Sequence, residues 1–349
     1  MKTRVERLRE QLAPEEAVLI VSYPNLFYFS GFESEDGCLV VSKEKAILFT
    51  DSRYTIQARQ QAPDFEIQNI EHLASVLKQL PQTQIGYEED KMTVRAFGRL
   101  QEQLDKKAFM PRQSLISSLR QKKDDAEIQK LREAEKIGDE AFSYILGQIR
   151  PGRTEREIAL ELEFFMKKRG AAALSFETIA ASGVRSAMPH GVASDKVLET
   201  GDFLTLDFGC VFEGYCSDMT RTVVLGKASQ KQKQIYELVL HAQKAALEAI
   251  AIGKKCSEID RVARELICQG GYGDCFGHAL GHSVGIEIHE SPNLSPKCDT
   301  VIAPGHILTV EPGIYVEGFG GVRIEDLIAV RATGIENLTS SPKELIEIH

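Results

Sequence analysis

The stretch Phe276-Gly-His-Ala-Leu-Gly-His-Ser-Val-Gly-Ile-Glu-Ile-His-Glu290 places three histidines, His278, His282 and His289, within twelve residues. The whole chain has only eight histidines, so a cluster this dense indicates a shared chemical role. Four carboxylates outside the stretch stand at strand positions or strand ends among apolar neighbours; they are Asp207, Asp218, Glu311 and Glu325. Together the histidine stretch and these acids predict a dinuclear metal site.

The physical reason is the cost of burying so many like charges. Asp207 lies in Leu-Asp-Phe-Gly and Glu311 in Thr-Val-Glu-Pro-Gly, and Arg323 is the one positive residue beside the four acids. An ionised carboxylate is costly to bury unless it is paired or bound to a metal. Two divalent cations resolve the repulsion, as in two-metal aminopeptidases. Four carboxylates and one imidazole suit Mn²⁺, Co²⁺, Fe²⁺ or Zn²⁺, and the hard, oxygen-rich set favours Mn²⁺.

The order of the ligand types is specific. Asp, Asp, His, Glu and Glu, with a separation of 218 − 207 = 11 between the aspartates, resembles the pita-bread metallopeptidase family of methionine aminopeptidase, aminopeptidase P and prolidase. The stretch from His278 to Glu290 resembles the motif of the Xaa-Pro peptidase branch, prolidase and aminopeptidase P. Arg323, two residues before the last glutamate, is also similar to that branch and not to methionine aminopeptidases. The resemblance covers roughly residues 125–349.

The resemblance implies a role for each ligand. Asp207 would bind one metal ion, and His282 with Glu311 would bind the other. Asp218 and Glu325 would bridge the two ions. A water shared by the metals would become hydroxide near neutral pH and attack the scissile carbonyl.

The resemblance also implies which residues would contact the substrate. His289 would donate a hydrogen bond to the developing oxyanion, and Glu311 would pass a proton to the leaving proline nitrogen. His190 resembles the substrate-facing histidine of the family, and His278 resembles a second one in this branch. Without the resemblance, His190 would be an ordinary loop histidine and His278 a packed one. Arg323 would either bind substrate or neutralise surplus carboxylate charge.

Two domains are predicted, because 349 residues exceed the length of a typical single domain. Residues 1–122 alternate between helix and strand patterns without clustered catalytic groups. This pattern predicts an accessory α/β domain, similar to the smaller N-terminal domain of the creatinase and prolidase branch. Residues 123–349 are predicted to form the catalytic pita-bread domain, which makes the protein α+β. The acidic loop 31–37 is either a solvated turn or a surface presented to another subunit.

Within the second domain, three patterns define the expected elements. Apolar spacing predicts a long helix over 126–149, and a Thr154 to Glu157 capping box starts the next helix. Alternation over 203–209 and 217–223 predicts a hairpin that brings its two aspartates to one surface. The segment 321–330 predicts one continuous strand with Arg323 and Glu325 on the same face.

Composition narrows the class of protein. The net charge of −9 argues against a nucleic-acid binder that relies on phosphate contacts. An odd number of cysteines, seven, without a CxxC pair indicates reduced thiols. The charged N-terminus has no apolar core of a signal peptide, and no apolar run has the length of a membrane span. We therefore expect a cytoplasmic protein with no membrane partner.

The sequence thus predicts a dinuclear-metal exopeptidase that hydrolyses Xaa-Pro bonds in small peptides, as a dipeptidase or an aminopeptidase. A methionine-aminopeptidase-like enzyme is one alternative, and the additional N-terminal domain counts against it. A non-catalytic pseudo-peptidase that only binds partners is another, and the presence of all five ligands counts against it. The resemblance also implies a homodimer.

Overall fold

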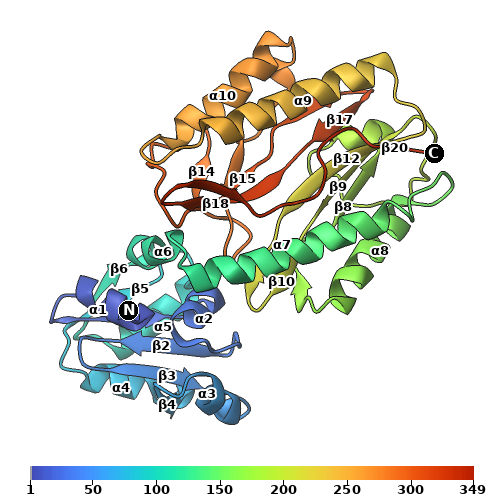
Figure 1. Cartoon of the computed structure of the whole chain (residues 1–349). Coiled ribbons are helices and arrows are strands. Elements are labelled where there is room, and N and C mark those ends of the chain that lie inside the picture. Colours follow the sequence, from blue (N-terminus) through green and yellow to red (C-terminus); the bar gives the residue numbers. More distant parts are fainter. Residues whose placement is uncertain (1) are drawn as a thin grey trace. The chain divides into compact units, whose positions relative to one another are not determined.

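The computed structural model describes residues 2–349, which form two compact units (Figure 1). The first unit ends at Arg120, and the second runs from Gln121 to His349. Among the described residues, no helix combines the length and the apolar character that crossing a bilayer requires.

The first unit is built on a mixed six-stranded sheet. Its elements in chain order are α1 (Arg4–Gln11), β1 (Glu16–Ile20), α2 (Tyr23–Ser30), β2 (Gly37–Val41), β3 (Ala46–Thr50), α3 (Thr55–Gln61), β4 (Glu66–Asn69), a 3₁₀ turn (Ile70–His72), α4 (Leu73–Gln79), β5 (Gln84–Tyr87), α5 (Val94–Gln103), β6 (Ala108–Pro111) and α6 (Gln113–Gln121). The strand order is β4-β3-β2-β1-β5-β6. Alternate residues of β1, Ala17 and Leu19, pack in one core with Leu77 of α4 and Leu100 of α5. The edge strands β4 and β6 have exposed ends and only short apolar patterns, which explains why the sequence did not predict them.

The second unit has two pairs of long helices and several short sheets between them (Figure 1). The helices are α7 (Asp125–Ile145), α8 (Glu155–Lys168), α9 (Gln230–Ala249) and α10 (Cys256–Gln269), with 3₁₀ turns at Gly183–Ala187 and Gly273–Cys275. The strands are β7 (Ala173–Leu174), β8 (Ile179–Ser182), β9 (Phe203–Phe208), β10 (Cys210–Phe212), β11 (Tyr215–Cys216), β12 (Met219–Leu225), β13 (Gly281–Ser283), β14 (Glu290–Leu294), β15 (Ile307–Val310), β16 (Gly313–Val316), β17 (Gly320–Arg323), β18 (Asp326–Arg331), β19 (Gly334–Asn337) and β20 (Glu347–Ile348).

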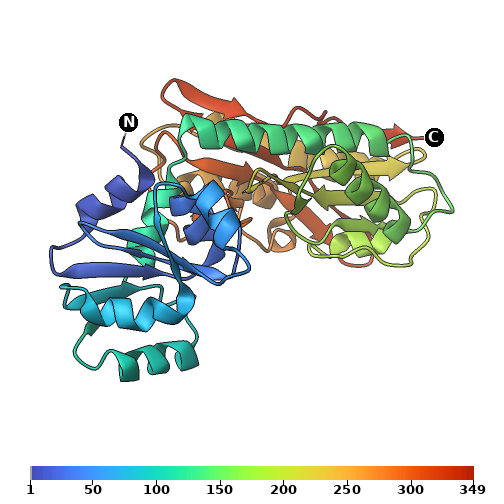
Figure 2. The ribbon, with the colours of Figure 1, turned by 90° about the horizontal axis from the view of Figure 1, so that it is seen from below.

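The central strand β9 separates two hydrophobic cores. Leu204, Leu206 and Phe208 belong to the core that includes residues of α7 and α8. Phe203 belongs to the core that α9 and α10 share with β15 and β18. Figure 2 shows α7 and α8 beside the sheet that contains β9. The alternation predicted for 203–209 is therefore confirmed, and it leaves Asp207 on the face away from α7 and α8.

The predicted hairpin is also confirmed, because β9 and β12 pair antiparallel with Thr220 opposite Asp207. The capping box is present, since Thr154 Oγ1 accepts the backbone N–H of Glu157 and the Glu157 carboxylate accepts that of Thr154. The long helix, predicted to reach residue 149, ends at Ile145. After this residue the backbone tightens into turns in which Gln148 N–H donates to the Ile145 carbonyl.

The prediction of one continuous strand over 321–330 was wrong. The chain leaves one small sheet at Arg323 and enters another at Asp326, so β17 and β18 belong to different sheets. The connecting residue Glu325 donates its backbone N–H to the Thr220 carbonyl of β12, at 3.1 Å. This contact draws the backbone out of both sheets. The break therefore places the Glu325 side chain against the strand that follows Asp218.

Candidate metal centre and active site

Two aspartates reach the site from the antiparallel strands β9 and β12. Asp207 lies near the end of β9, and Asp218 stands one residue before β12. Between them the backbones approach closely at Gly209, where a Cβ atom would lie 2.0 Å from the Ser217 carbonyl oxygen. Only glycine permits this approach. The glycine that follows the Leu-Asp-Phe sequence is thus part of the reason why the two carboxylates meet.

Thr220 of β12 links the aspartate strands to the last glutamate. Its hydroxyl donates to Glu325 Oε2 at 2.6 Å and accepts from Arg323 Nε at 3.0 Å. Its carbonyl accepts the Glu325 backbone N–H. These contacts fix Glu325 by both its main chain and its side chain.

His282 and Glu311 are brought together by a second close approach. A Cβ atom at Gly281 would lie 2.0 Å from the Thr309 carbonyl oxygen, so β13 and β15 can be neighbours only with glycine at this position. The Thr309 hydroxyl accepts the backbone N–H of His282 at 2.9 Å and donates to Glu311 Oε1 at 3.1 Å. One threonine therefore orients His282 of β13 and Glu311, which directly follows β15.

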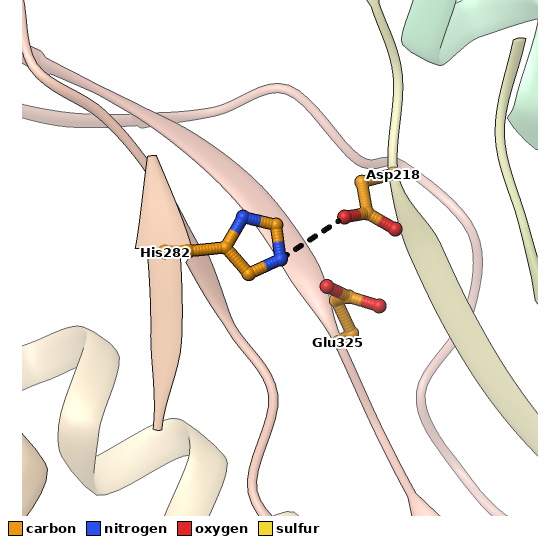
Figure 3. Close-up of side chains that lie close together, drawn as sticks. All are labelled: Asp218, His282 and Glu325. Carbon is orange, nitrogen blue, oxygen red and sulfur yellow. Dashed lines mark ion pairs between the residues drawn. The ribbon is translucent and has the colours of Figure 1, made fainter. Parts of the chain in front are cut away.

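The predicted ligands converge from these elements. Ligand atoms of Asp218, His282 and Glu325 all lie within 4.8 Å of one another (Figure 3). His282 Nε2 is 3.4 Å from Asp218 Oδ2 and 3.4 Å from Glu311 Oε1. All of the predicted ligands line one pocket of about 460 Å³, and they are Asp207, Asp218, His282, Glu311 and Glu325.

Burial makes the carboxylates of Asp218, Glu311 and Glu325 unusually basic. Desolvation, and then the charges of neighbouring carboxylates, raise the pKa values of Asp218 and Glu325 well above their ordinary range. Burial raises the pKa of Glu311 to about 8, with Arg323 opposing the shift and Asp207 adding to it. Shifts of this kind occur where like charges are gathered without enough counter-charge inside the protein.

Comparisons with known proteins identify the family. Residues 129–332 match the family model of metallopeptidase family M24, and residues 4–122 match that of the creatinase/prolidase N-terminal domain. The chain belongs to metallopeptidase family M24. The resemblance and the fold class predicted from the sequence are therefore confirmed.

Relatives of this M24 metallopeptidase span its whole length. It is 38% identical over 351 residues to an Xaa-Pro dipeptidase of Pyrococcus furiosus, covering 99% of this chain and 100% of the relative. It is similar to the solved structure of an Xaa-Pro dipeptidase from Bacillus anthracis, with a TM-score of 0.96, 46% identity and 99% of each chain covered. It is also similar to the structure of an X-Pro aminopeptidase from Thermotoga maritima, with a TM-score of 0.93 and 39% identity over 99% of this chain and 100% of the other.

The donor set fits the divalent metals of this metallopeptidase family. His282 Nδ1 lies 3.1 Å from the Ser283 carbonyl oxygen, which can only accept, so the ring proton is on Nδ1. Burial lowers the His282 pKa to about 4, which leaves the imidazole neutral at pH 7. Its Nε2 lone pair therefore faces the carboxylates of Asp218 and Glu311, an arrangement that a cation between them stabilises. Asp207 Oδ1 is buried without a hydrogen-bond partner, as expected for an oxygen that serves as a metal ligand.

The histidines predicted to bind substrate differ in their surroundings. His190, His278 and His289 all line the pocket. His190 and His289 are exposed, and the ring centroid of His289 lies 4.5 Å from that of His282. Both ring nitrogens of His278 are engaged, Nδ1 with the Ala279 carbonyl at 2.8 Å and Nε2 with the Tyr315 hydroxyl at 2.9 Å. The geometry thus favours His190 and His289 for direct contact with a substrate.

Arg323 donates hydrogen bonds to one proposed ligand and to neighbouring residues. Its Nη2 donates to Asp207 Oδ2 at 2.5 Å, and its Nη1 donates to the Tyr315 hydroxyl at 2.8 Å and to the Pro189 carbonyl at 3.1 Å. With its Nε–H given to Thr220, four of the five guanidinium donors are used. Of the two roles that the sequence left open, these contacts favour charge neutralisation.

Tyr315 is a site residue that the sequence analysis missed. Its hydroxyl accepts from Arg323 and donates to His278, whose Nε2 is the acceptor because Nδ1 carries the proton. It lies in β16, four residues after Glu311. A single tyrosine in a short strand pattern carries no signal of this role.

Proposed function

We propose that this M24 metallopeptidase is a dinuclear-metal exopeptidase that hydrolyses Xaa-Pro bonds in small peptides. The observation that carries the proposal is the neutral His282, whose Nε2 lone pair faces two carboxylates in a pocket that also holds exposed His190 and His289. The names of its relatives, Xaa-Pro dipeptidase and X-Pro aminopeptidase, support the substrate class.

Asp207, Asp218, His282, Glu311 and Glu325 would hold the two metal ions. When bound, these ions supply a water of lowered pKa and polarise the scissile carbonyl. Exposed His289 is placed to donate a hydrogen bond to the carbonyl oxygen as negative charge develops there. Glu311, held by the Thr309 hydroxyl, is the residue that passes a proton to the leaving proline nitrogen. His190 contacts the peptide from the loop that Arg323 fixes through the Pro189 carbonyl.

The finer properties are also proposals. The oxygen-rich ligand set favours Mn²⁺ over Co²⁺, Zn²⁺ and Fe²⁺. All seven cysteines are free thiols, which supports a reducing compartment such as the cytoplasm. We propose a homodimer from the family resemblance, and light scattering of the purified protein tests it. Metal analysis of protein purified without chelators tests the metal.

The preferred peptide length depends on how the pocket receives a free carboxylate. A dipeptide ends at proline, so its carboxylate must be neutralised close to the metals. The arginine that lines the pocket, Arg323, has four of its donors engaged. Exposed His190 is then the pocket residue available to a proline carboxylate, and His190→Ala should raise KM for a dipeptide more than for a tripeptide.

A peptide panel tests the activity. The protein is stripped of metal, reloaded with Mn²⁺ and assayed on Ala-Pro, Ala-Pro-Ala and Met-Ala. We expect cleavage of the proline substrates only with metal present. Equal rates on Ala-Pro and Ala-Pro-Ala would exclude a strict dipeptidase. Cleavage of Met-Ala without Ala-Pro would establish the methionine-aminopeptidase alternative, and metal binding with no hydrolysis of any peptide would overturn the proposal.

A further inference from the structure

Glu135 is a buried carboxylate for which the proposed mechanism has no role. It lies on α7, four residues after Leu131 and seven after Ile128, where the helical repeat places an apolar residue. Its exposed fraction is 0%. Because an ionised side chain is costly to bury, a glutamate at such a position needs compensating contacts.

The contacts of Glu135 lead directly to a metal ligand. Its Oε2 accepts the backbone N–H of Asp218 at 3.2 Å, and its Oε1 accepts the Thr339 hydroxyl at 2.6 Å. The Thr339 hydroxyl also accepts the Leu327 backbone N–H at 2.9 Å, so its single hydrogen is available to Glu135. Both carboxylate oxygens are therefore acceptors, and one of them fixes the peptide that carries Asp218.

We propose that Glu135 is a positioning residue that sets the metal affinity of the site by holding the backbone of Asp218. Asp218 would bridge the two proposed metal ions, so a small rotation of its peptide would move its carboxylate relative to both. Residues that orient ligands in this way typically contribute about 10- to 100-fold to metal affinity or activity.

The same helix supplies a matched control. Glu127 lies two turns before Glu135 on α7 and is 2% exposed. Its Oε1 accepts the hydroxyl of Tyr215, three residues before Asp218, at 2.8 Å. Both glutamates therefore attach α7 to the same connection between β10 and β12, but Glu135 contacts the ligand residue itself. If Glu135 served only to pack the helix, the two glutamine variants would behave alike.

The test compares Glu135→Gln with Glu127→Gln in the full chain. Glutamine keeps the size of the side chain but has one acceptor oxygen in place of two, so it cannot accept from both the Asp218 peptide and the Thr339 hydroxyl. Metal-free protein is titrated with Mn²⁺ by calorimetry and with Co²⁺ by visible absorption. We expect Glu135→Gln to weaken metal binding about tenfold or more and to alter the Co²⁺ spectrum. The metal affinity of Glu127→Gln should stay within about twofold of that of the original protein.

The outcomes separate this inference from the proposed function on which it rests. If the original protein binds no metal, the proposed centre fails. If it binds metal and Glu135→Gln gives the same isotherm, or Glu127→Gln causes an equal loss, only the role of Glu135 is overturned.

Circular dichroism of the metal-free variants shows whether they are folded. If Glu135→Gln does not fold, Thr339→Val is measured instead; a weakened isotherm with an altered Co²⁺ spectrum supports the inference, and an unchanged isotherm overturns it.

Discussion

Glu325 and Asp326 are consecutive buried acids with opposite surroundings. Asp326 Oδ1 accepts from Arg221 at 2.8 Å, and its Oδ2 accepts from Lys343 at 2.6 Å. The amides of Gln243 and Asn337 also donate to Oδ2. Glu325 instead faces the other acids of the metal centre. A buried acid whose own chain supplies cations and donors is structural, whereas one gathered with other acids depends on a cation from solution.

The two environments shift the pKa values in opposite directions. Burial alone raises the pKa of Asp326, but Arg221 and Lys343 outweigh it and hold the pKa below its ordinary value. Burial raises the pKa of Glu325, and the charges of Glu311 and Asp207 raise it further. Asp326 is thus stable as an anion in the folded chain, whereas Glu325 would be stable as an anion only with the proposed metal ions bound.

The largest expected effect comes from removing the charge of Glu325. Glu325→Gln deletes a proposed bridging ligand, so we expect kcat on Ala-Pro to fall about a thousandfold or more and metal binding to be weakened. The metal-free protein should keep its stability, because one of several repelling acids is gone. Peptidase assays, Mn²⁺ calorimetry and thermal melts of metal-free protein measure these effects. A metal-free variant much less stable than the original would contradict this view of the site.

Asp326→Asn should show the converse pattern. It leaves buried Arg221 and half-buried Lys343 without their carboxylate. Breaking a buried pair such as Arg221 with Asp326 typically costs about 3–5 kcal/mol. We expect this loss in urea unfolding of the metal-free protein. At temperatures where the variant is folded, the number of metal ions bound should be unchanged. Normal stability combined with lost metal binding would reverse the roles assigned to the two acids.

The sequence predicted Glu325 but could not predict how the chain reaches it. Ligand order and motif are local signals, so the resemblance predicted Asp207, Asp218, His282, Glu311 and Glu325 as ligands, and the structure brings all five to one pocket. The bend between β17 and β18 arises from a backbone contact with Thr220, more than a hundred residues earlier in the chain. Such long-range hydrogen bonds leave no periodic pattern in the sequence.

The contacts of the residues that hold the proposed ligands in place could not be predicted from the sequence either. Glu135 interrupts an apolar stripe, which is a visible signal, but only the folded chain shows that its partner is the Asp218 peptide. Tyr315 and the engaged donors of Arg323 likewise became apparent only from contacts between distant strands. The sequence therefore predicted the atoms that would face the metals better than the contacts that hold those atoms in place.

A smaller effect is expected at His289, which lies near His282 but outside the ligand set. His289→Ala should lower kcat on Ala-Pro about a hundredfold, because a hydrogen bond to the developing oxyanion is lost. The Mn²⁺ isotherm should remain that of the original protein. His282→Ala is the matched variant, and it should lose metal. If His289→Ala also loses metal, the assignment of ligand and catalytic histidine is wrong.

The smallest effect is a dependence of metal affinity on pH. The pKa of Glu311 is raised from 4.5 to about 8, so the metal-free folded chain retains protons that its unfolded form releases. The stability that this group provides is therefore present below about pH 4.5 and is lost as the pH rises through about 8. Metal must displace the same protons, so affinity should increase up to about tenfold per pH unit for each proton released. Calorimetry at pH 7 in buffers of different ionisation enthalpy measures that release.

The two neighbouring acids should differ in this measurement. Asp326 is already ionised and should contribute nothing, so Asp326→Asn should release the same number of protons as the original protein. Glu325→Gln should release fewer. Equal proton release by the Glu325→Gln variant and the original protein would mean that Glu325 is already ionised in the metal-free site, contrary to the contrast between these two neighbours.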